Sequence, residues 1–262
     1  MSALILVLVG VASGVTTALF GFGGGFVAVP VLVWADAALG DDAPRVAVAT
    51  SSVLMVVAAA VATASTSRTV LAELRGSGRL LGLLALGGAL GAVAARHVPG
   101  DVIAVGFVAY LLLTIAAVTA RPGFLQAGAD GARPLPAGAG LPIGAVAAFL
   151  GVGGSVVTVP LMRRNGHRMA VATALANPLT LAVALPATAV FLLLSGGRPV
   201  GAGAGFVGAV DVLAAAALLA GSLPVIVFLR RRGPRLSDRA HARWYVGLLV
   251  VVAVAMTAAL FR

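Results

Sequence analysis

Long apolar stretches alternate with short polar separators along the whole chain. The apolar stretches cover residues 3–36, 44–66, 79–95, 101–119, 139–162, 169–195, 212–229 and 244–261. A helix needs about 20 apolar residues to cross the hydrocarbon of a bilayer, and a helix that is apolar all round suits lipid contact or the inside of a bundle. The pattern therefore predicts an all-α integral membrane protein with about eight hydrophobic segments.

The composition excludes most soluble classes. Only 10% of the 262 residues are charged, whereas a soluble domain carries roughly 25%. The net charge of +10 comes from 18 arginines and no lysine, and most of them stand beside apolar segments, as positive-inside anchors do. Basic stretches interleaved with aromatic residues are missing, so we expect no nucleic-acid partner. Cysteine is absent, which excludes disulfides and thiolate metal sites.

The N-terminal apolar stretch reads as a retained membrane segment. Residues Ala3 to Leu19 have no basic region before them and no convincing cleavage site after them, unlike a secretory signal peptide. We therefore expect a multi-pass protein of the inner (plasma) membrane, with the lipid bilayer as its surroundings.

A doubled motif indicates an internal repeat. Residues 19–32 read LFGFGGGFVAVPVL and residues 149–162 read FLGVGGSVVTVPLM, an offset of 130 positions. A second pair, RVAVAT at 45–50 and RMAVAT at 168–173, follows in the same order. We predict one transporter domain over residues 1–262, with repeat 1 at about 1–120, a linker at about 121–138 and repeat 2 at about 139–262.

The arginines indicate how the glycine-broken segments 3–36 and 139–162 run. If both cross the membrane completely, the arginines divide 11 to 7 between the two sides. If both return as re-entrant hairpins, the division is 14 to 4, which the positive-inside rule prefers. Three full spans then remain per repeat, so the repeats would be inverted, as in many transporters. Segment 139–162 is also long enough to cross once.

The glycine-rich breaks are the first candidate site. Glycine lets the backbone turn sharply and approach a ligand closely. A half-helix that starts near Gly25 or Ser155 would present free N–H groups and a positive dipole end to an anion. Close packing of helices through small residues is the alternative. The candidate residues are Gly21, Gly23, Gly24, Gly25 and Pro30 in the first break, and Gly151, Gly153, Gly154, Ser155 and Pro160 in the second. We expect both prolines within the first helical turns, where proline disturbs a helix least.

Small polar residues on the next segment are the second candidate set. Their hydroxyl and amide groups are natural donors to sulfonate or carboxylate oxygens. The alternative is hydrogen bonding back to carbonyls of the same helix. The candidates are Thr50, Ser51, Thr173 and Asn177, with Ser52 beside them and Thr180 as a weaker member.

Asp211 is the one acidic residue within a mainly apolar run. An acid inside a membrane segment suggests proton or cation coupling, but its place directly before segment 212–229 favours a helix N-cap. His97, His167 and His241 stand beside arginines, in expected loops, without the spacing of metal ligands. No catalytic constellation or Walker-type loop appears. We expect neither enzyme activity nor a cofactor or metal.

These motifs resemble the TauE/SafE family of sulfite-exporter-like membrane permeases. The resemblance rests on GFGGGFVAVPVL and RVAVATSS with their second copies GVGGSVVTVPLM and RMAVATALANP, and it covers essentially the whole chain. It implies a secondary transporter for a small anion such as sulfite, a sulfonate or sulfoacetate, with the glycine motifs in both halves carried over. The second copy has Ser155 where the first has Gly25. An anion channel and a non-transporting membrane scaffold are the alternatives. The substrate, the direction of transport, a coupling ion (H⁺ or Na⁺) and the oligomeric state stay open.

Overall fold

The computed structural model describes residues 2–120, 124–125, 132–194, 205–232 and 236–260. Its elements are α1 (Ala3–Phe20), α2 (Gly25–Ala35), η1 (Ala37–Asp42), α3 (Ala43–Ala64), α4 (Arg68–Leu71), η2 (Ala72–Leu74), α5 (Gly78–His97), α6 (Gly100–Thr119), η4 (Ala137–Ala139), α7 (Gly140–Leu150), α8 (Ser155–Arg164), α9 (Met169–Leu193), β1 (Phe206–Val207), β2 (Val210–Asp211), α10 (Val212–Arg232) and α11 (Asp238–Leu260). Within the described residues, seven helices are long and apolar enough to cross a membrane. The all-α fold class is confirmed.

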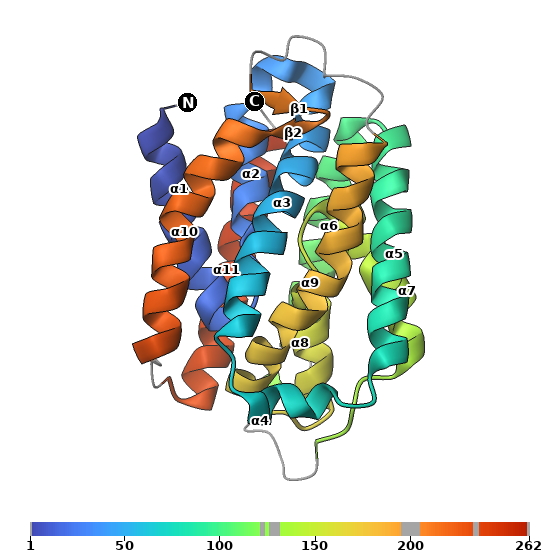
Figure 1. Cartoon of the computed structure of the whole chain (residues 1–262), viewed down its shortest axis with the longest axis vertical. Helices are drawn as coiled ribbons and strands as arrows, with labels where there is room; N and C mark the ends of the chain where they lie inside the picture. Colours follow the sequence, from blue (N-terminus) through green and yellow to red (C-terminus); the bar gives the residue numbers. More distant parts are fainter. Residues whose placement is uncertain (1, 121–123, 126–131, 195–204, 233–235, 261–262) are drawn as a thin grey trace.

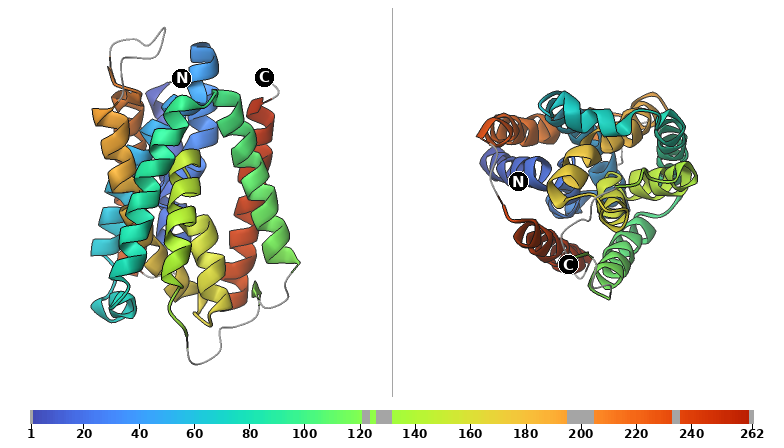
Figure 2. Two further views of the ribbon diagram at one scale, coloured as in Figure 1. Left: turned by 90° about the vertical axis from the view of Figure 1, so that its right-hand side faces the viewer. Right: turned by 90° about the horizontal axis from the view of Figure 1, so that it is seen from below.

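Both glycine-broken segments turn back on themselves (Figures 1 and 2). In Figure 1, α1 descends from the upper end and α2 returns to it. The helices α7 and α8 form a second hairpin that rises from the lower end. The start of α7 and the end of α8 are tied together there, because Asn165 Nδ2 donates to the Pro134 carbonyl at 3.1 Å. The hairpins differ in length, since α1 has 18 residues but α7 only 11.

Glycine in the left-handed conformation ends the first helix of each hairpin. Gly21 follows α1 with φ of 74° and Gly151 follows α7 with φ of 68°. This conformation suits a residue without a Cβ atom and is the common way for a helix to end. The same two positions of the doubled motif therefore produce the same backbone break.

Small residues bring pairs of helices into backbone contact. A Cβ atom at Gly14 of α1 would lie 2.6 Å from the Ser222 carbonyl oxygen of α10, and one at Gly144 of α7 would lie 2.3 Å from the Leu84 oxygen of α5. Seen from below in Figure 2, α1 with α10 lies at one corner of the molecule, α5 with α7 at a second and α6 with α11 at the third. Close approach through glycine is typical of membrane helices.

Three expectations about local structure were wrong. The helix α11 begins at Asp238, six residues before the apolar segment 244–261, because hydropathy marks the lipid-facing part of a helix and not its end. His241 consequently lies within a helix, not in a loop. Pro30 and Pro160 are the sixth residues of α2 and α8, so they lie in the second helical turn. Half of the expected linker 121–138, residues 121–123 and 126–131, lies outside the described residues.

Candidate functional site

The two glycine breaks meet inside the molecule. A Cβ atom at Gly25 would lie 2.8 Å from the carbonyl oxygen of Gly151. Residues 126 positions apart therefore place backbone against backbone, which only a residue without a side chain permits at this distance. Gly21 similarly faces α9, where a Cβ atom would come within 2.2 Å of the Thr173 carbonyl oxygen.

Thr180 of α9 and Met55 of α3 lie between the breaks. Cβ atoms at Gly23 and Gly153 would lie 2.7 and 2.8 Å from the same Thr180 methyl carbon. The Met55 sulfur would lie 2.7 Å from a Cβ atom at Gly25 and 3.1 Å from one at Gly153. Both side chains are buried. The corresponding glycines of the two motifs thus approach one shared threonine, which was only a weaker member of the second candidate set.

The half-helices α2 and α8 begin at these breaks. Their N-cap residues are Gly24 and Gly154, neither of which provides a side-chain hydrogen bond to the helix. Buried helix ends normally find partners for their free N–H groups. An uncapped N-terminus carries partial positive charge and is suited to bind an anion.

Several buried polar atoms on α8 and α9 have no hydrogen-bond partner among the described residues. They are the Ser155 Oγ, the Thr158 Oγ1, the Asn177 Oδ1 and the Thr180 Oγ1. All four residues have no exposed surface. Each unpaired buried polar group costs about 1–3 kcal/mol, so a cluster of them calls for an explanation. Three are hydroxyl groups, which can donate to an anionic oxygen.

Other polar groups of the predicted residues hydrogen-bond within the protein. Thr173 Oγ1 donates to Met169 O at 3.0 Å, and Asn177 Nδ2 donates to Thr173 O at 3.3 Å, both within α9. Ser51 Oγ donates to Val48 O at 2.9 Å and lies 3.2 Å from the Gly151 carbonyl oxygen of the second break. Ser51 therefore joins α3 to the site.

Thr50 and Asp211 form a separate contact near the upper end. Thr50 Oγ1 accepts a hydrogen bond from the Asp211 backbone N–H at 2.9 Å. The Asp211 carboxylate accepts one from the Ala214 N–H at 2.9 Å, as an N-cap of α10 does. The geometry therefore has the N-cap that the position of Asp211 in the sequence favoured.

The glycines of the two breaks differ at the third paired position. Gly24 has φ of 88°, in the left-handed region, whereas Gly154 has φ of −72°. The nearest atom to a Cβ at Gly154 lies at 3.7 Å, an ordinary contact. Glycine is therefore required by conformation at Gly151 and Gly153 but not at Gly154. The expectation that Gly154 needs freedom in φ was wrong.

Tyr245 of α11 compensates for Pro160. Proline has no N–H, so the Val156 carbonyl four residues earlier receives no helical hydrogen bond. The Tyr245 hydroxyl donates to Val156 O at 3.0 Å and lies 3.3 Å from Ser155 O. Its ring packs on Phe22 of the first break, with centroids 5.2 Å apart. One buried side chain thus contacts both breaks.

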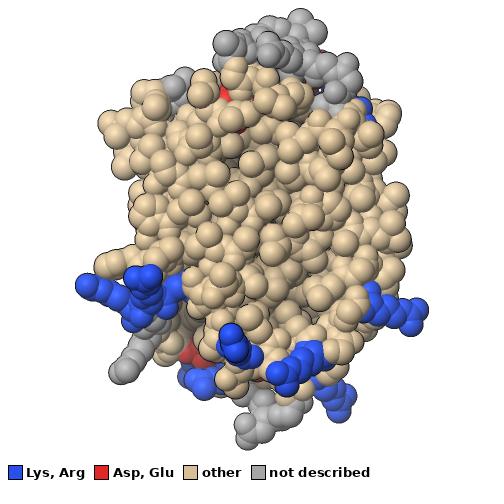
Figure 3. Space-filling view, viewed as in Figure 1, with Lys and Arg blue, Asp and Glu red and all other residues tan. Residues whose placement is uncertain are grey.

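Charged residues gather at the two ends of the molecule. In Figure 3 a broad uncharged belt separates the basic lower end from the upper end. The described arginines of the lower end are Arg68, Arg75, Arg79, Arg133, Arg163, Arg164, Arg168, Arg230, Arg231, Arg232, Arg239 and Arg243, against Arg45 and Arg96 at the upper end. Arg163 is buried, 2.7 Å from Asp238 Oδ2, and it also donates to Phe124 O.

Asp36, after α2, is a residue that sequence reasoning missed. Burial, and then the neighbouring Asp211, raise the pKa of the Asp36 carboxyl to about 6. Its Oδ2 has no hydrogen-bond partner among the described residues. Hydropathy gave no signal here, because a single acid at the end of the apolar segment 3–36 resembles an ordinary residue at the edge of a loop.

Comparison with known proteins agrees with this architecture. The model of the sulfite exporter TauE/SafE family matches residues 6–256. No curated protein and no solved structure matches the chain. The matched region includes both glycine breaks, and it contains all of the long apolar helices among the described residues except the first residues of α1 and the last residues of α11. Since nearly the whole chain is matched, this multi-pass membrane protein belongs to the TauE/SafE family of membrane transporters.

Proposed function

We propose that the protein is a secondary transporter for a sulfite-like or organosulfonate anion, bound where the two glycine breaks meet. The observation that carries the proposal is the set of unpaired, fully buried hydroxyls of Ser155, Thr158 and Thr180 beside an uncapped helix N-terminus. Hydroxyl donors and the positive end of a helix dipole attract an anion without a fully charged side chain. The anion is therefore bound weakly enough to be released again, as transport requires. The family match supports the same class of solute.

The packing favours a transporter over an open channel. Thr180 and Met55 fill the space between the breaks. A solute can bind there only when the hairpins separate from each other or from α3 and α9. Movement of one part of the bundle around a central site is the basis of alternating access.

The test uses Thr180→Val, which keeps the methyl group that contacts both breaks and removes the hydroxyl. If the hydroxyl binds the anion, its loss should weaken sulfite uptake into proteoliposomes at low concentration by about tenfold or more, as expected for a hydrogen bond to a charged group. The thermal stability should not fall, because the hydroxyl is unpaired in the protein. The control is Thr257→Val on α11, where the hydroxyl donates to Ala253 O.

Two outcomes would contradict the proposal. An unchanged concentration dependence in Thr180→Val would place the site elsewhere. Flux that never saturates, and that an ion gradient cannot drive uphill, would indicate an anion channel.

A further inference from the structure

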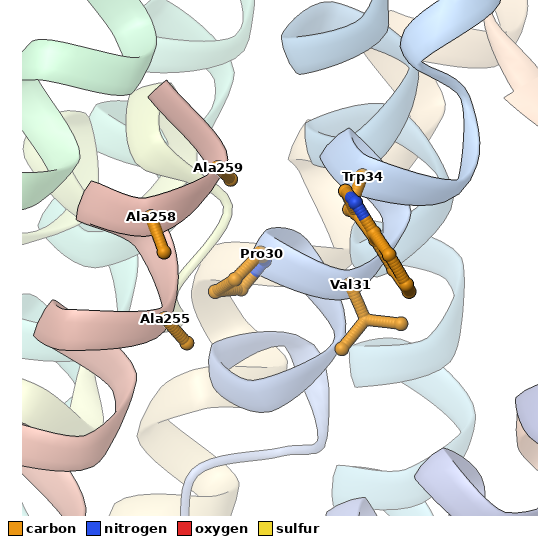
Figure 4. A pocket seen from close by; sticks show the side chains of 6 residues that line it. All are labelled: Pro30, Val31, Trp34, Ala255, Ala258 and Ala259. Carbon is orange, nitrogen blue, oxygen red and sulfur yellow. The ribbon is translucent and has the colours of Figure 1, made fainter. Parts of the chain in front are cut away.

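Two surface grooves lie at corresponding places of the repeated motif. The first has a volume of about 230 Å³ and is formed by α2 and α11; its lining residues are Pro30, Val31, Trp34, Ala255, Ala258 and Ala259 (Figure 4). The second has a volume of about 270 Å³ and is formed by α8 and α6. Pro160, Leu161 and Arg164 line it at the positions that match Pro30, Val31 and Trp34.

The second groove combines an apolar wall with one cation. Its α6 wall includes Leu113, which is 71% exposed, and Val118. Arg164 ends α8 at the basic end of the molecule and is exposed. No described carboxylate forms an ion pair with it. Arg133 lies close to the same helix end, since its backbone N–H donates to Asn165 O at 2.8 Å.

We propose that the groove between α6 and α8 binds an anionic phospholipid, with the acyl chain along Pro160 and Leu161 and the phosphate at Arg164. The argument is charge complementarity: Arg164 lies at the basic end of the molecule, where a lipid phosphate would meet it. A positive side chain at the boundary of an apolar groove attracts an anionic lipid, and the apolar wall of the groove suits an acyl chain. The first groove has Trp34 in the corresponding place, an amphipathic ring suited to the interface but without charge. The proposal is independent of the proposed transport function.

Lipid binding to the delipidated full-length protein provides the test. We expect phosphatidylglycerol to bind and to survive in native mass spectra. Arg164→Gln should weaken this binding roughly fivefold, the effect of one arginine near a lipid surface, and Arg164→Lys should retain most of it. Arg168→Gln is the matched control, because Arg168 is exposed nearby but does not line the groove. Phosphatidylcholine, diacylglycerol and inorganic phosphate should each bind more weakly than phosphatidylglycerol.

Tryptophan quenching locates the lipid. In a Trp34→Phe, Trp244→Phe background, Leu113→Trp should be quenched by brominated phosphatidylglycerol at lower mole fractions than by brominated phosphatidylcholine. Native Trp34, with Trp244→Phe alone, should respond equally to both lipids. The proposal is overturned if Arg164→Gln binds phosphatidylglycerol like the wild type, if inorganic phosphate competes as well as the lipid, or if Leu113→Trp does not distinguish the two headgroups.

Discussion

At the scale of single residues, each glycine of a break meets its own constraint. Gly23 and Gly153 combine a left-handed backbone with contact to the Thr180 methyl group. Gly25 has an ordinary helical backbone, but the Met55 sulfur and the Gly151 carbonyl leave no room for a Cβ atom. At the position that corresponds to Gly25, the second break accommodates Ser155, whose hydroxyl belongs to the unpaired cluster.

Gly153→Ala and Gly154→Ala form a matched pair for this distinction. Alanine at position 153 should lower the free energy of unfolding by about 1–2 kcal/mol through the left-handed backbone alone, and more through the contact with Thr180. Alanine at position 154 should be neutral or stabilising by about 0.4–1 kcal/mol, because it restricts only the unfolded chain. Thermal unfolding in detergent measures both. Equal losses in the two variants would contradict the geometry of the break.

The Asp36 carboxyl should make stability depend on pH. Its pKa is raised from 3.8 to about 6 in the folded protein, so the fold binds more protons than the unfolded chain between these values. The stabilisation that this proton provides is present below about pH 4 and is lost as the pH rises through 6. Asp36→Asn should flatten that part of the curve of melting temperature against pH. Asp211→Asn should shift the transition to lower pH, since Asp211 raises the Asp36 pKa.

At the scale of elements, hydropathy and glycine patterns predicted the main helices and both breaks. The positions 25 and 155 where the half-helices start were predictable, because four glycine or serine residues and a proline recur at fixed spacing. The early start of α11 was not, since Arg239 and Arg243 lower the hydropathy of a continuous helix. The position of Thr180 between the two breaks could not be predicted from the sequence either. It depends on contacts between residues 27 and 157 positions apart, and no local pattern reports these.

Tyr245 shows how one element supports another. Tyr245→Phe would leave the Val156 carbonyl, freed by Pro160, buried without a donor. We expect a loss of about 1–3 kcal/mol in the free energy of unfolding. Tyr110→Phe is the control, because Tyr110 is the only other tyrosine of the chain and lines the groove between α6 and α8 instead. If the two variants melt at the same temperature, the tyrosine hydrogen bond does not hold α8.

At the scale of the whole molecule, paired contacts favour the predicted repeat. Gly10 and Gly14 contact Leu218 and Ser222 of α10, and Gly140 and Gly144 contact Leu80 and Leu84 of α5. The glycines are 130 positions apart and their partners 138. Each hairpin thus packs on a helix of the other half. The inverted twofold relation stays a prediction, and so does the assignment of the basic end to the cytoplasm.

Cysteine labelling tests that assignment without background, because the natural chain has no cysteine. Ala38 in η1 is exposed at the upper end, and Arg75 and Ser237 are exposed at the lower end. Arg75 is preferable to its neighbour Gly76, whose φ of 83° would strain a side chain. The excess of arginine at the lower end predicts that this end is cytoplasmic. A membrane-impermeant maleimide should therefore label Ala38→Cys in intact cells, and Arg75→Cys and Ser237→Cys only in inside-out vesicles.

Labelling of Ala38→Cys and Ser237→Cys from the same side would contradict the hairpin arrangement. Labelling of all three from the sides opposite to those expected would keep the fold but reverse its orientation, with the basic end outside.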